Sequence, residues 1–249
     1  MSLPNGGAVT VRPVALVTGG ARRIGAALSR ASARRGYHVA IHHRQSPDEA
    51  AALVREIESS GGSAHAVVAD LLDADAPEQL VSDVVARCGR LDLLVNSAAN
   101  MLRTPVGRTT PAQWDEIFAL NTRAPFFLAQ AAARHLGEGS SIVNMADLAA
   151  FETWGGYVPH AMSKAAIVQM TRALARVLAP KIRVNAIAPG VVLLPEWLDA
   201  GAVEHLAETT PLKHHGSPED VVRAFDYLLD ATFVTGEVLL VDGGRHVRR

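Results

Sequence analysis

The stretch Val-Ala-Leu-Val-Thr-Gly-Gly-Ala-Arg-Arg-Ile-Gly, residues 14–25, decides the fold. It joins a short apolar run, typical of a buried strand, to a glycine-rich turn and then to a segment with the apolar spacing of a helix. In such a unit the free N–H groups and the dipole of the helix point at the phosphates of a dinucleotide. Gly19 permits the tight turn, and Gly25 lets the helix approach the sheet closely. The stretch therefore predicts a dinucleotide-binding domain.

Similar apolar runs recur along the chain, and longer segments with helical spacing separate them. The runs lie at residues 14–17, 39–42, 64–68, 91–95, 141–145, 184–187 and 238–241. Strands that are apolar throughout and alternate with helices indicate a parallel sheet covered on both faces. No linker rich in Pro, Gly or Ser and no internal repeat interrupts the alternation. We predict an α/β protein: a single Rossmann domain over residues 1–249, with a seven-stranded parallel doubly wound sheet and about six helices.

Composition and charge exclude several classes of protein. Apolar residues make up 49% of the chain and charged residues 20%, which is typical of a globular domain. The 24 basic and 25 acidic side chains nearly cancel, so we expect neither nucleic acid nor a membrane surface as a partner. The sequence has no apolar run of about 18 residues and no signal-peptide pattern, and Cys88 is its only cysteine. We expect a soluble, cytoplasmic protein without a disulfide.

The end of the second predicted strand indicates which dinucleotide binds. An NAD site usually carries Asp or Glu at this place, to bond the ribose 2′-hydroxyl. Here the sequence is His42-His43-Arg44-Gln45-Ser46, with no carboxylate and with a guanidinium that suits a phosphate. Arg22 adds a second cation beside the glycine-rich turn. The sequence therefore favours NADP(H) as the cofactor.

Two histidine pairs are candidates for a metal site. His42-His43 and His214-His215 are adjacent in sequence, and adjacent side chains of an extended chain point to opposite sides. We therefore expect no metal site.

Residues 190–217 carry Pro195, Trp197, Pro211 and three histidines before a helical pattern resumes at Pro218. An insertion after the carboxyl end of a strand reads as a substrate lid, and a plain surface excursion is the alternative.

The chain from Val14 to about His246 resembles the short-chain dehydrogenase/reductase family. The closest similarity is to pteridine reductases and bacterial dihydromonapterin (dihydrofolate) reductases. It rests on Arg23 in place of the usual middle glycine, on residues 179–189 and on residues 233–246. The turn and the resemblance together give the following expected cofactor-binding residues: Gly19, Arg22, Arg23, Ile24, Gly25, His43, Arg44, Ser46, Asp70, Leu71, Asn96, Ser97, Ala98, Lys164, Pro189, Gly190 and Val192. For Asp70 a helix-capping role is the alternative to bonding the adenine.

The resemblance also implies a catalytic set with one departure. In the family a Tyr lies four residues before a Lys, and pteridine reductases carry an Asp thirteen residues before that Tyr. Here Asp147 and Lys164 fit, His160 occupies the tyrosine position, and Asn121 matches the residue that helps hold a proton-relay water. Histidine can donate a proton at neutral pH, since free imidazole has a pKa of about 6.5 against about 10 for tyrosine.

The substrate side departs from the family as well. Pteridine reductases stack the pterin on an aromatic ring at the position that is Asn100 here, followed by Met101. Trp154, Tyr157 or Trp197 are candidates to supply a ring. Tyr157 is also a candidate substitute for the missing tyrosine, although Pro159 favours the first helical turn and so leaves Tyr157 outside the helix.

Two functions remain open at this stage. The first is an NADPH-dependent short-chain oxidoreductase of a pterin, a dihydrofolate-like compound or a non-pterin carbonyl compound. The second is a catalytically impaired NADP-binding protein with a regulatory or scaffold role. The resemblance further implies a homotetramer built on the fourth and fifth helices and the C-terminal strand.

Overall fold

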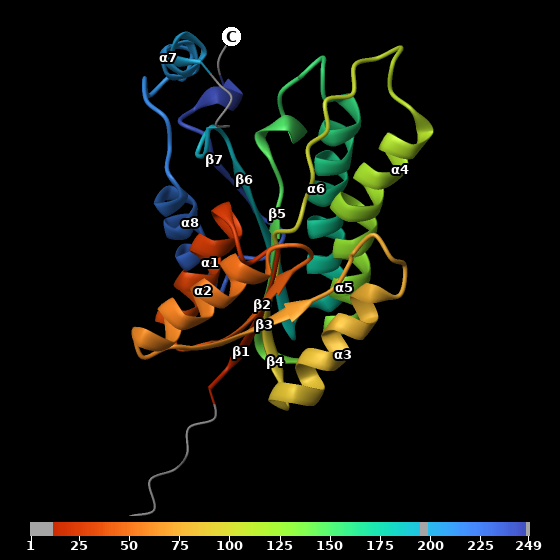
Figure 1. The fold of residues 1–249 in the computed structure, drawn as a ribbon, viewed down its shortest axis with the longest axis vertical. Helices are drawn as coiled ribbons and strands as arrows, with labels where there is room; N and C mark the ends of the chain where they lie inside the picture. The colour runs from red at the N-terminus through yellow and green to blue at the C-terminus, as the bar shows by residue number, and fades with distance from the viewer. Residues whose placement is uncertain (1–11, 195–198, 248–249) are drawn as a thin grey trace, which may run out of the picture.

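The computed structural model describes residues 12–194 and 199–247, and its centre is one seven-stranded parallel sheet (Figure 1). The strand order is β3-β2-β1-β4-β5-β6-β7. The strands are β1 (Val14–Thr18), β2 (His38–His43), β3 (Ser63–Val68), β4 (Leu91–Asn96), β5 (Leu136–Met145), β6 (Ile182–Pro189) and β7 (Val238–Val241). The order runs outward in one direction from β1 and in the other from β4, so a crevice opens between the carboxyl ends of these two strands. The predicted sheet and fold class are confirmed.

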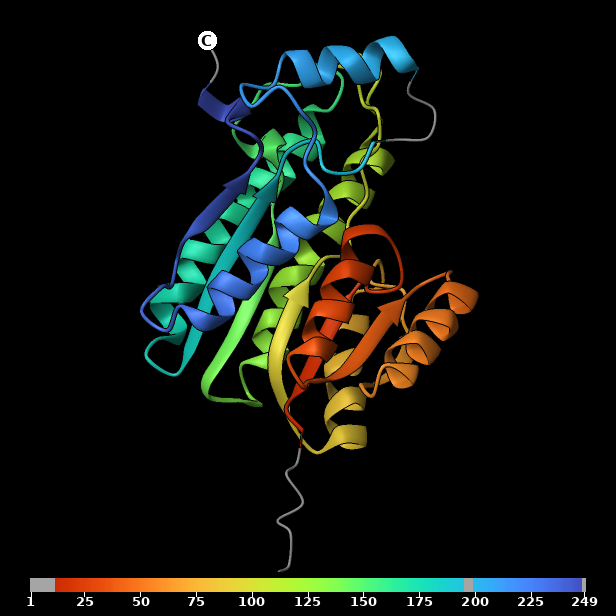
Figure 2. The same ribbon diagram turned by 90° about the vertical axis from the view of Figure 1, so that its left-hand side faces the viewer.

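Helices cover both faces of the sheet, as Figures 1 and 2 show. One face carries α1 (Arg23–Arg34), α2 (Pro47–Ser59) and α8 (Pro218–Asp230), whose apolar residues pack in one buried cluster. The other face carries α3 (Ala76–Cys88), α4 (Pro111–Phe118), α5 (Ala124–Ala132) and α6 (Val158–Leu178), with α3 and α5 at the centre of a second cluster. Alternate residues of β1 contribute to the two clusters, which is why that strand is apolar throughout.

Two features change the helix arrangement expected from the sequence. A π-helical turn, Ala119–Arg123, joins α4 to α5 in one continuous run. The insertion at residues 190–217 contains its own helix, α7 (Ala200–Glu208), beside which residues 195–198 lie outside the described part. The described residues therefore form seven helical runs instead of about six. No helix among them has the length and apolar character needed to cross a membrane.

Candidate cofactor and catalytic site

A cavity of about 660 Å³ lies at the carboxyl ends of the central strands. Its wall comes from the turn after β1, the ends of β2, β4 and β5, and the start of α6. The expected site residues on this wall are Gly19, Arg22, Arg23, Ile24, Gly25, Arg44, Ser46, Asp70, Leu71, Ser97, Ala98, Asn100, Met101, Asp147, His160, Lys164 and Pro189. Segments that are far apart in the sequence therefore meet at one cavity.

The glycine-rich turn is shaped so that only glycine fits at two positions. A Cβ at Gly25 would lie 2.0 Å from the carbonyl oxygen of Gly19, and a Cβ at Gly19 would lie 2.9 Å from the Cα of Ala98. The hydroxyl of Thr18 accepts the N–H groups of Ser97 and Ala98, at 3.0 and 3.2 Å, which ties the turn to the end of β4. The first turn of α1 carries neither an acidic residue nor a side-chain cap, so its N–H groups face the cavity without a competing anion.

Arg23 stands in an unusual backbone conformation. Its φ angle is +52°, in the left-handed region that favours glycine, at the position where the family usually has one. Its guanidinium donates to the carbonyl oxygen of Leu193 at 3.4 Å, so the turn also contacts the start of the 190–217 insertion. An arginine here places a fixed positive charge directly on the cavity wall.

His42 bonds the glycine-rich turn at Gly19, although the sequence did not indicate His42 as a site residue. Its Nδ1 accepts the N–H of Gly19 at 3.1 Å, and its Nε2 donates to the carbonyl of Ala69 at 3.1 Å. Burial lowers the pKa of His42 to about 4, so the ring is neutral and keeps the tautomer that both bonds require. Side chains alternate along a strand, so His42 points toward the turn while His43, the residue expected at the cofactor, does not line the cavity.

Two arginines at the rim have only weak partners. Arg44 lies 3.7 Å from Asp70, and Arg22 lies 3.7 Å from Glu49; all four side chains are at least two-fifths exposed. Exposed ion pairs of this kind contribute little to stability, so both guanidinium groups are available to an incoming anion. The carboxylate of Asp70 also accepts the N–H of Leu72 at 3.0 Å, but it caps no helix, because α3 begins at Ala76 and its N-cap is Asp75.

Four expected cofactor residues do not line the cavity: His43, Asn96, Gly190 and Val192. Asn96 is buried and donates to the side chain of Asn144 at 2.9 Å, so it holds β4 to β5. Gly190 packs against Asp242, because a Cβ at Gly190 would lie 2.8 Å from the Cα of that residue. Wall residues that sequence reasoning left out, besides His42, are Ala99, Glu116, Leu120, Met145 and Ala146.

Lys164 and Asp147 bring opposite charges to the inner end of the cavity. Lys164 is buried on α6, and its Nζ donates to the carbonyl of Met145 at 2.8 Å. Burial lowers the pKa of Lys164, and the carboxylate of Asp147 partly offsets that effect. Asp147 follows β5 directly; its Oδ1 accepts the N–H of Ala149 at 2.8 Å, while its Oδ2 faces His160.

His160 lines the cavity, and its two ring nitrogens have different surroundings. Its Nδ1 lies 3.1 Å from the carbonyl oxygen of Asn100, which can only accept, so Nδ1 carries a proton. Its Nε2 is buried, has no hydrogen-bond partner among the described residues and lies 3.5 Å from Oδ2 of Asp147. A bare Nε2 would direct its lone pair at a carboxylate, whereas a protonated Nε2 would be attracted to it.

Asn121 acts on His160 through the backbone of Asn100. The amide of Asn121 accepts the Asn100 N–H and donates to the Asn100 carbonyl, both at 2.9 Å, and it also donates to Ser163 at 3.1 Å. Asn121 lies in the π-helical turn, which widens the helix at this point. The carbonyl that fixes Nδ1 of His160 is therefore itself held in place.

The aromatic residues considered from the sequence lie off the cavity wall. Tyr157 precedes α6, as its place before Pro159 predicts, and its ring meets that of Trp154 edge to face at 6.4 Å. Neither ring lines the cavity, so neither supplies the aromatic ring that the sequence led us to expect beside the substrate. Trp197 lies outside the described residues. Of the expected substrate residues that the structure describes, only Asn100 and Met101 reach the wall.

Almost the whole chain is similar to known proteins in sequence and in fold. The family model described as enoyl-(acyl carrier protein) reductase matches residues 19–246. The putative ketoacyl reductase 2 of the granaticin polyketide synthase from Streptomyces violaceoruber is 36% identical over 245 residues, which are 94% of this chain and 96% of the relative.

Solved structures are similar to the same extent. FolM alternative dihydrofolate reductase 1 from Brucella canis, complexed with NADP, has a TM-score of 0.90 and 35% identity, covering 96% of both chains. A short-chain dehydrogenase/reductase from Serratia marcescens has a TM-score of 0.89 and 34% identity, covering 94% of this chain and 98% of that one. With a matching family model, relatives above 30% identity and near-complete coverage, the chain belongs to the short-chain dehydrogenase/reductase family of oxidoreductases.

Proposed function

We propose that the protein is an NADPH-dependent reductase of a small C=N or C=O compound, with pterins and dihydrofolate-like compounds first. The observation that carries this proposal is His160: a buried ring on the cavity wall whose Nε2 has no hydrogen-bond partner among the described residues and lies 3.5 Å from Asp147. A reduction that adds hydride to carbon leaves negative charge on the heteroatom, which needs a proton donor within hydrogen-bond reach. A ring placed in this way meets that need.

The cavity fits NADP(H) on several independent grounds. The glycine turn leaves no room for a Cβ, the start of α1 offers free N–H groups, and Arg22 and Arg44 lie at the rim. Arg44 would meet a 2′-phosphate, and no carboxylate occupies its position to bond a free 2′-hydroxyl. NADPH, when bound, supplies the hydride; the remaining groups needed for reduction are those of this chain.

The residues of the inner cavity would complete the reaction by moving one proton. Protonated His160 would give its Nε2 proton to the substrate heteroatom as the carbon accepts hydride. The substrate would thus gain one hydride and one proton, which together amount to two electrons and two protons. Asp147 stabilises the charged ring before the transfer, because the two groups lie 3.5 Å apart. Buried Lys164 places a positive charge beside the developing negative charge, and its bond to Met145 holds it there.

The substrate class is the finer part of the proposal. Pterin-like substrates are supported by the likeness to FolM of Brucella canis. A non-pterin carbonyl compound is the second candidate, and one observation favours it: among the described residues of the wall there is no Phe, Tyr or Trp to stack a pterin. The ketoacyl reductase relative is consistent with this second candidate. The insertion at 190–217, with α7, remains our proposed substrate lid.

A non-catalytic NADP-binding protein is the rival from another class. It would need the turn and the arginines but would have no chemical need for Asp147, Lys164 and a positioned His160 together. The two readings separate in one assay series. NADPH binding is first measured directly by fluorescence, and NADPH oxidation is then followed against dihydropterins, dihydrofolate, quinones and ketones. Turnover with any of them supports the reductase, binding without turnover supports the rival, and absence of binding contradicts both.

A further inference from the structure

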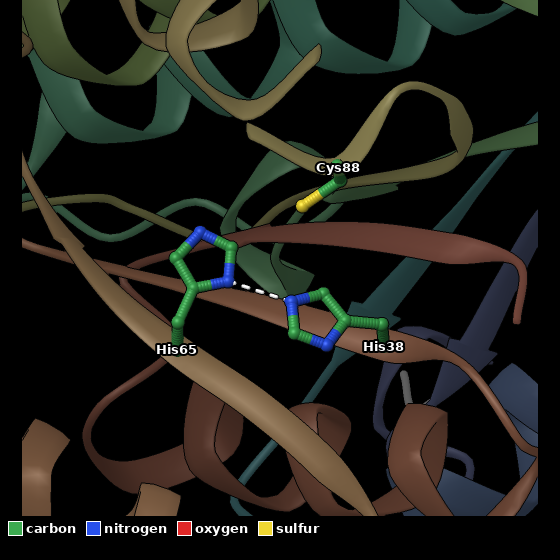
Figure 3. Close-up of side chains that lie close together, drawn as sticks. All are labelled: His38, His65 and Cys88. Atoms are coloured by element: carbon green, nitrogen blue, oxygen red, sulfur yellow. Dashed lines mark hydrogen bonds between the residues drawn. The ribbon is translucent and has the colours of Figure 1, made fainter. Parts of the chain in front are cut away.

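A second cluster of ligating side chains lies at the opposite end of the sheet from the cavity. His38 begins β2, His65 lies in β3, and Cys88 ends α3 (Figure 3). His38 pairs with Ser63, and Ala40 with His65, so both histidine side chains extend from the sheet face that α3 covers. In Figure 3 the sulfur of Cys88 points toward the space between the two rings.

The donor atoms already lie near the spacing that a metal ion requires. The ring nitrogens Nε2 of His38 and Nδ1 of His65 are 2.8 Å apart, and one ligand atom of each of the three residues lies within 4.8 Å of the others. Two N or S ligands on one tetrahedral Zn²⁺ are about 3.3–3.6 Å apart, given bond lengths of about 2.0 and 2.3 Å. The rings would move slightly apart and Sγ slightly inward, which side-chain rotation can supply.

The protonation states of the two rings also suit a metal ion. Burial is the main cause that lowers the pKa of both imidazoles, that of His65 to about 4, so both are neutral at pH 7. Neutral imidazole is the form that ligates. Nδ1 of His38 lies 2.7 Å from the hydroxyl of Ser63. When Nδ1–H donates to that hydroxyl, Nε2 of His38 carries a lone pair. In this structure that lone pair accepts a hydrogen bond from Nδ1 of His65 at 2.8 Å, a bond that the metal ion would replace.

Charge decides which ions are suitable. Arg12 and Arg87 line the adjoining cavity of about 330 Å³, and their positive charges disfavour a further cation. Burial raises the pKa of the Cys88 thiol, while Arg87 acts in the opposite direction. A metal that binds sulfur displaces the thiol proton to solvent and gains a thiolate, which offsets one positive charge. Hard ions such as Mg²⁺ do not select thiolate and would gain nothing here.

We propose that His38, His65 and Cys88 bind one thiolate-seeking metal ion, Zn²⁺ or Cu⁺, with a further coordination position open to the cavity beside Arg12 and Arg87. This site differs from the adjacent histidine pairs weighed in the sequence, because its three members are separated by 27 and 23 positions and meet only in the fold. Binding would tie the end of α3 to β2 and β3, two strands that already pair with each other in the sheet.

Cobalt substitution provides a direct test, because Cys88 is the only cysteine in the chain. Full-length protein without a histidine tag is reduced, freed of metal with a chelator, saturated with NADPH and titrated with Co²⁺. One equivalent should produce a sulfur-to-cobalt charge-transfer absorption, and Zn²⁺ should then displace the cobalt. Titration in competition with a Cu⁺ chelator under anaerobic conditions decides between the two native ions. Absence of the charge-transfer band in the unmodified protein would overturn the proposal.

Variants then separate this site from adventitious binding by other histidines. Cys88→Ser should remove the band and weaken Zn²⁺ binding at least about 100-fold, and Ser63→Ala should weaken it about 10-fold or more. His214→Asn, at an exposed ring, is the matched control and should leave both readouts unchanged. Circular dichroism and NADPH affinity check that each variant is folded. Stoichiometric Zn²⁺ binding that survives Cys88→Ser would place the ion elsewhere and contradict the proposal.

Discussion

At the scale of single residues, His160 is the residue on which the proposed reduction depends most. The ring is anchored by Asn100 and faces Asp147, so only the protonated form has a proton to give in the direction of the cavity. Free imidazole is protonated over a range of pH in which free phenol is always neutral, so a histidine enzyme and a tyrosine enzyme respond differently to pH.

The first prediction concerns catalysis by His160. We expect kcat/KM for reduction to fall as pH rises and the ring loses its proton, and His160→Phe to lower kcat/KM about 10²-fold or more. His160→Tyr should keep activity and move its decline to higher pH. Steady-state kinetics over pH 5–10 measure both effects, with His135→Phe, at an exposed ring, as the control. An unchanged pH profile in an active His160→Phe variant would show that the proton comes from elsewhere.

The second prediction concerns cofactor choice. NADPH should bind at least about 10-fold more tightly than NADH, because Arg44 can pair with the 2′-phosphate. Arg44→Asp should reverse the preference. Arg55→Asp makes the same change of charge at an exposed position of α2, away from the cavity wall, and should leave the preference as it is. Isothermal titration with both cofactors gives the ratio, and equal affinities in the unmodified protein would contradict the NADP assignment.

At the scale of elements, the junction of β1, β2 and α1 depends on His42. The neutral ring bonds the Gly19 N–H on one side and the Ala69 carbonyl on the other, and its protonation would break the first of these bonds. Because the pKa of His42 is lowered to about 4, the unfolded chain binds more protons than the folded protein between about pH 6.5 and 4. The stability contributed here is therefore present above pH 6.5 and decreases as the pH falls through this range.

The third prediction follows from this loss of stability at low pH. The free energy of unfolding should decrease by up to about 3 kcal/mol between pH 6.5 and 4 through His42 alone, since each pKa unit corresponds to about 1.4 kcal/mol. His42→Asn keeps an acceptor for Gly19 and should flatten this dependence, whereas His42→Leu should also weaken NADPH binding. Urea unfolding at several pH values and NADPH titration test the pair. A pH dependence that is the same in His42→Asn would assign the effect to other groups.

The elements show which parts of the fold could be predicted from the sequence. The strands could be predicted because each contains a short apolar run. β5 begins at Leu136, five residues before its predicted start, because residues 137–139 are partly or fully exposed and interrupt the apolar pattern. The π-helical turn leaves no mark in apolar spacing. The position of His43 in the sequence predicts that it contacts the cofactor. In the strand the side chains alternate in direction, and it is His42 that points toward the glycine-rich turn. The ring contact of Tyr157 with Trp154 depends on tertiary packing and could not be inferred.

At the scale of the whole molecule, the helices on one side leave large apolar residues exposed. Trp114 on α4, Phe126 and Phe127 on α5 and Met162 on α6 are each 37–47% exposed. These helices lie together on the right-hand side of Figure 1. Apolar residues gathered on neighbouring helices are typical of a surface that contacts another protein. They coincide with the helices on which the family resemblance implies a tetramer.

The fourth prediction concerns assembly through this surface. Light scattering coupled to size exclusion should give the mass of a tetramer, and Phe127→Glu should shift it to dimers or monomers, because a buried unpaired charge is costly at an interface. Val68→Glu introduces the same charge at an exposed apolar residue of the edge strand β3 and should leave the mass unchanged. A monomeric mass for the unmodified protein at micromolar concentration would contradict the expected assembly.

If His160 is the proton donor that we propose, its anchoring through Nδ1 limits the order of events in the catalytic cycle. Because the backbone carbonyl of Asn100 holds Nδ1, the ring would release and regain the transferred proton through Nε2, which lies 3.5 Å from Asp147. The ring would then regain its proton either after the product leaves or by way of Asp147, whose side chain is 26% exposed. Under either route, solvent would have to reach the inner end of the cavity once in every turnover.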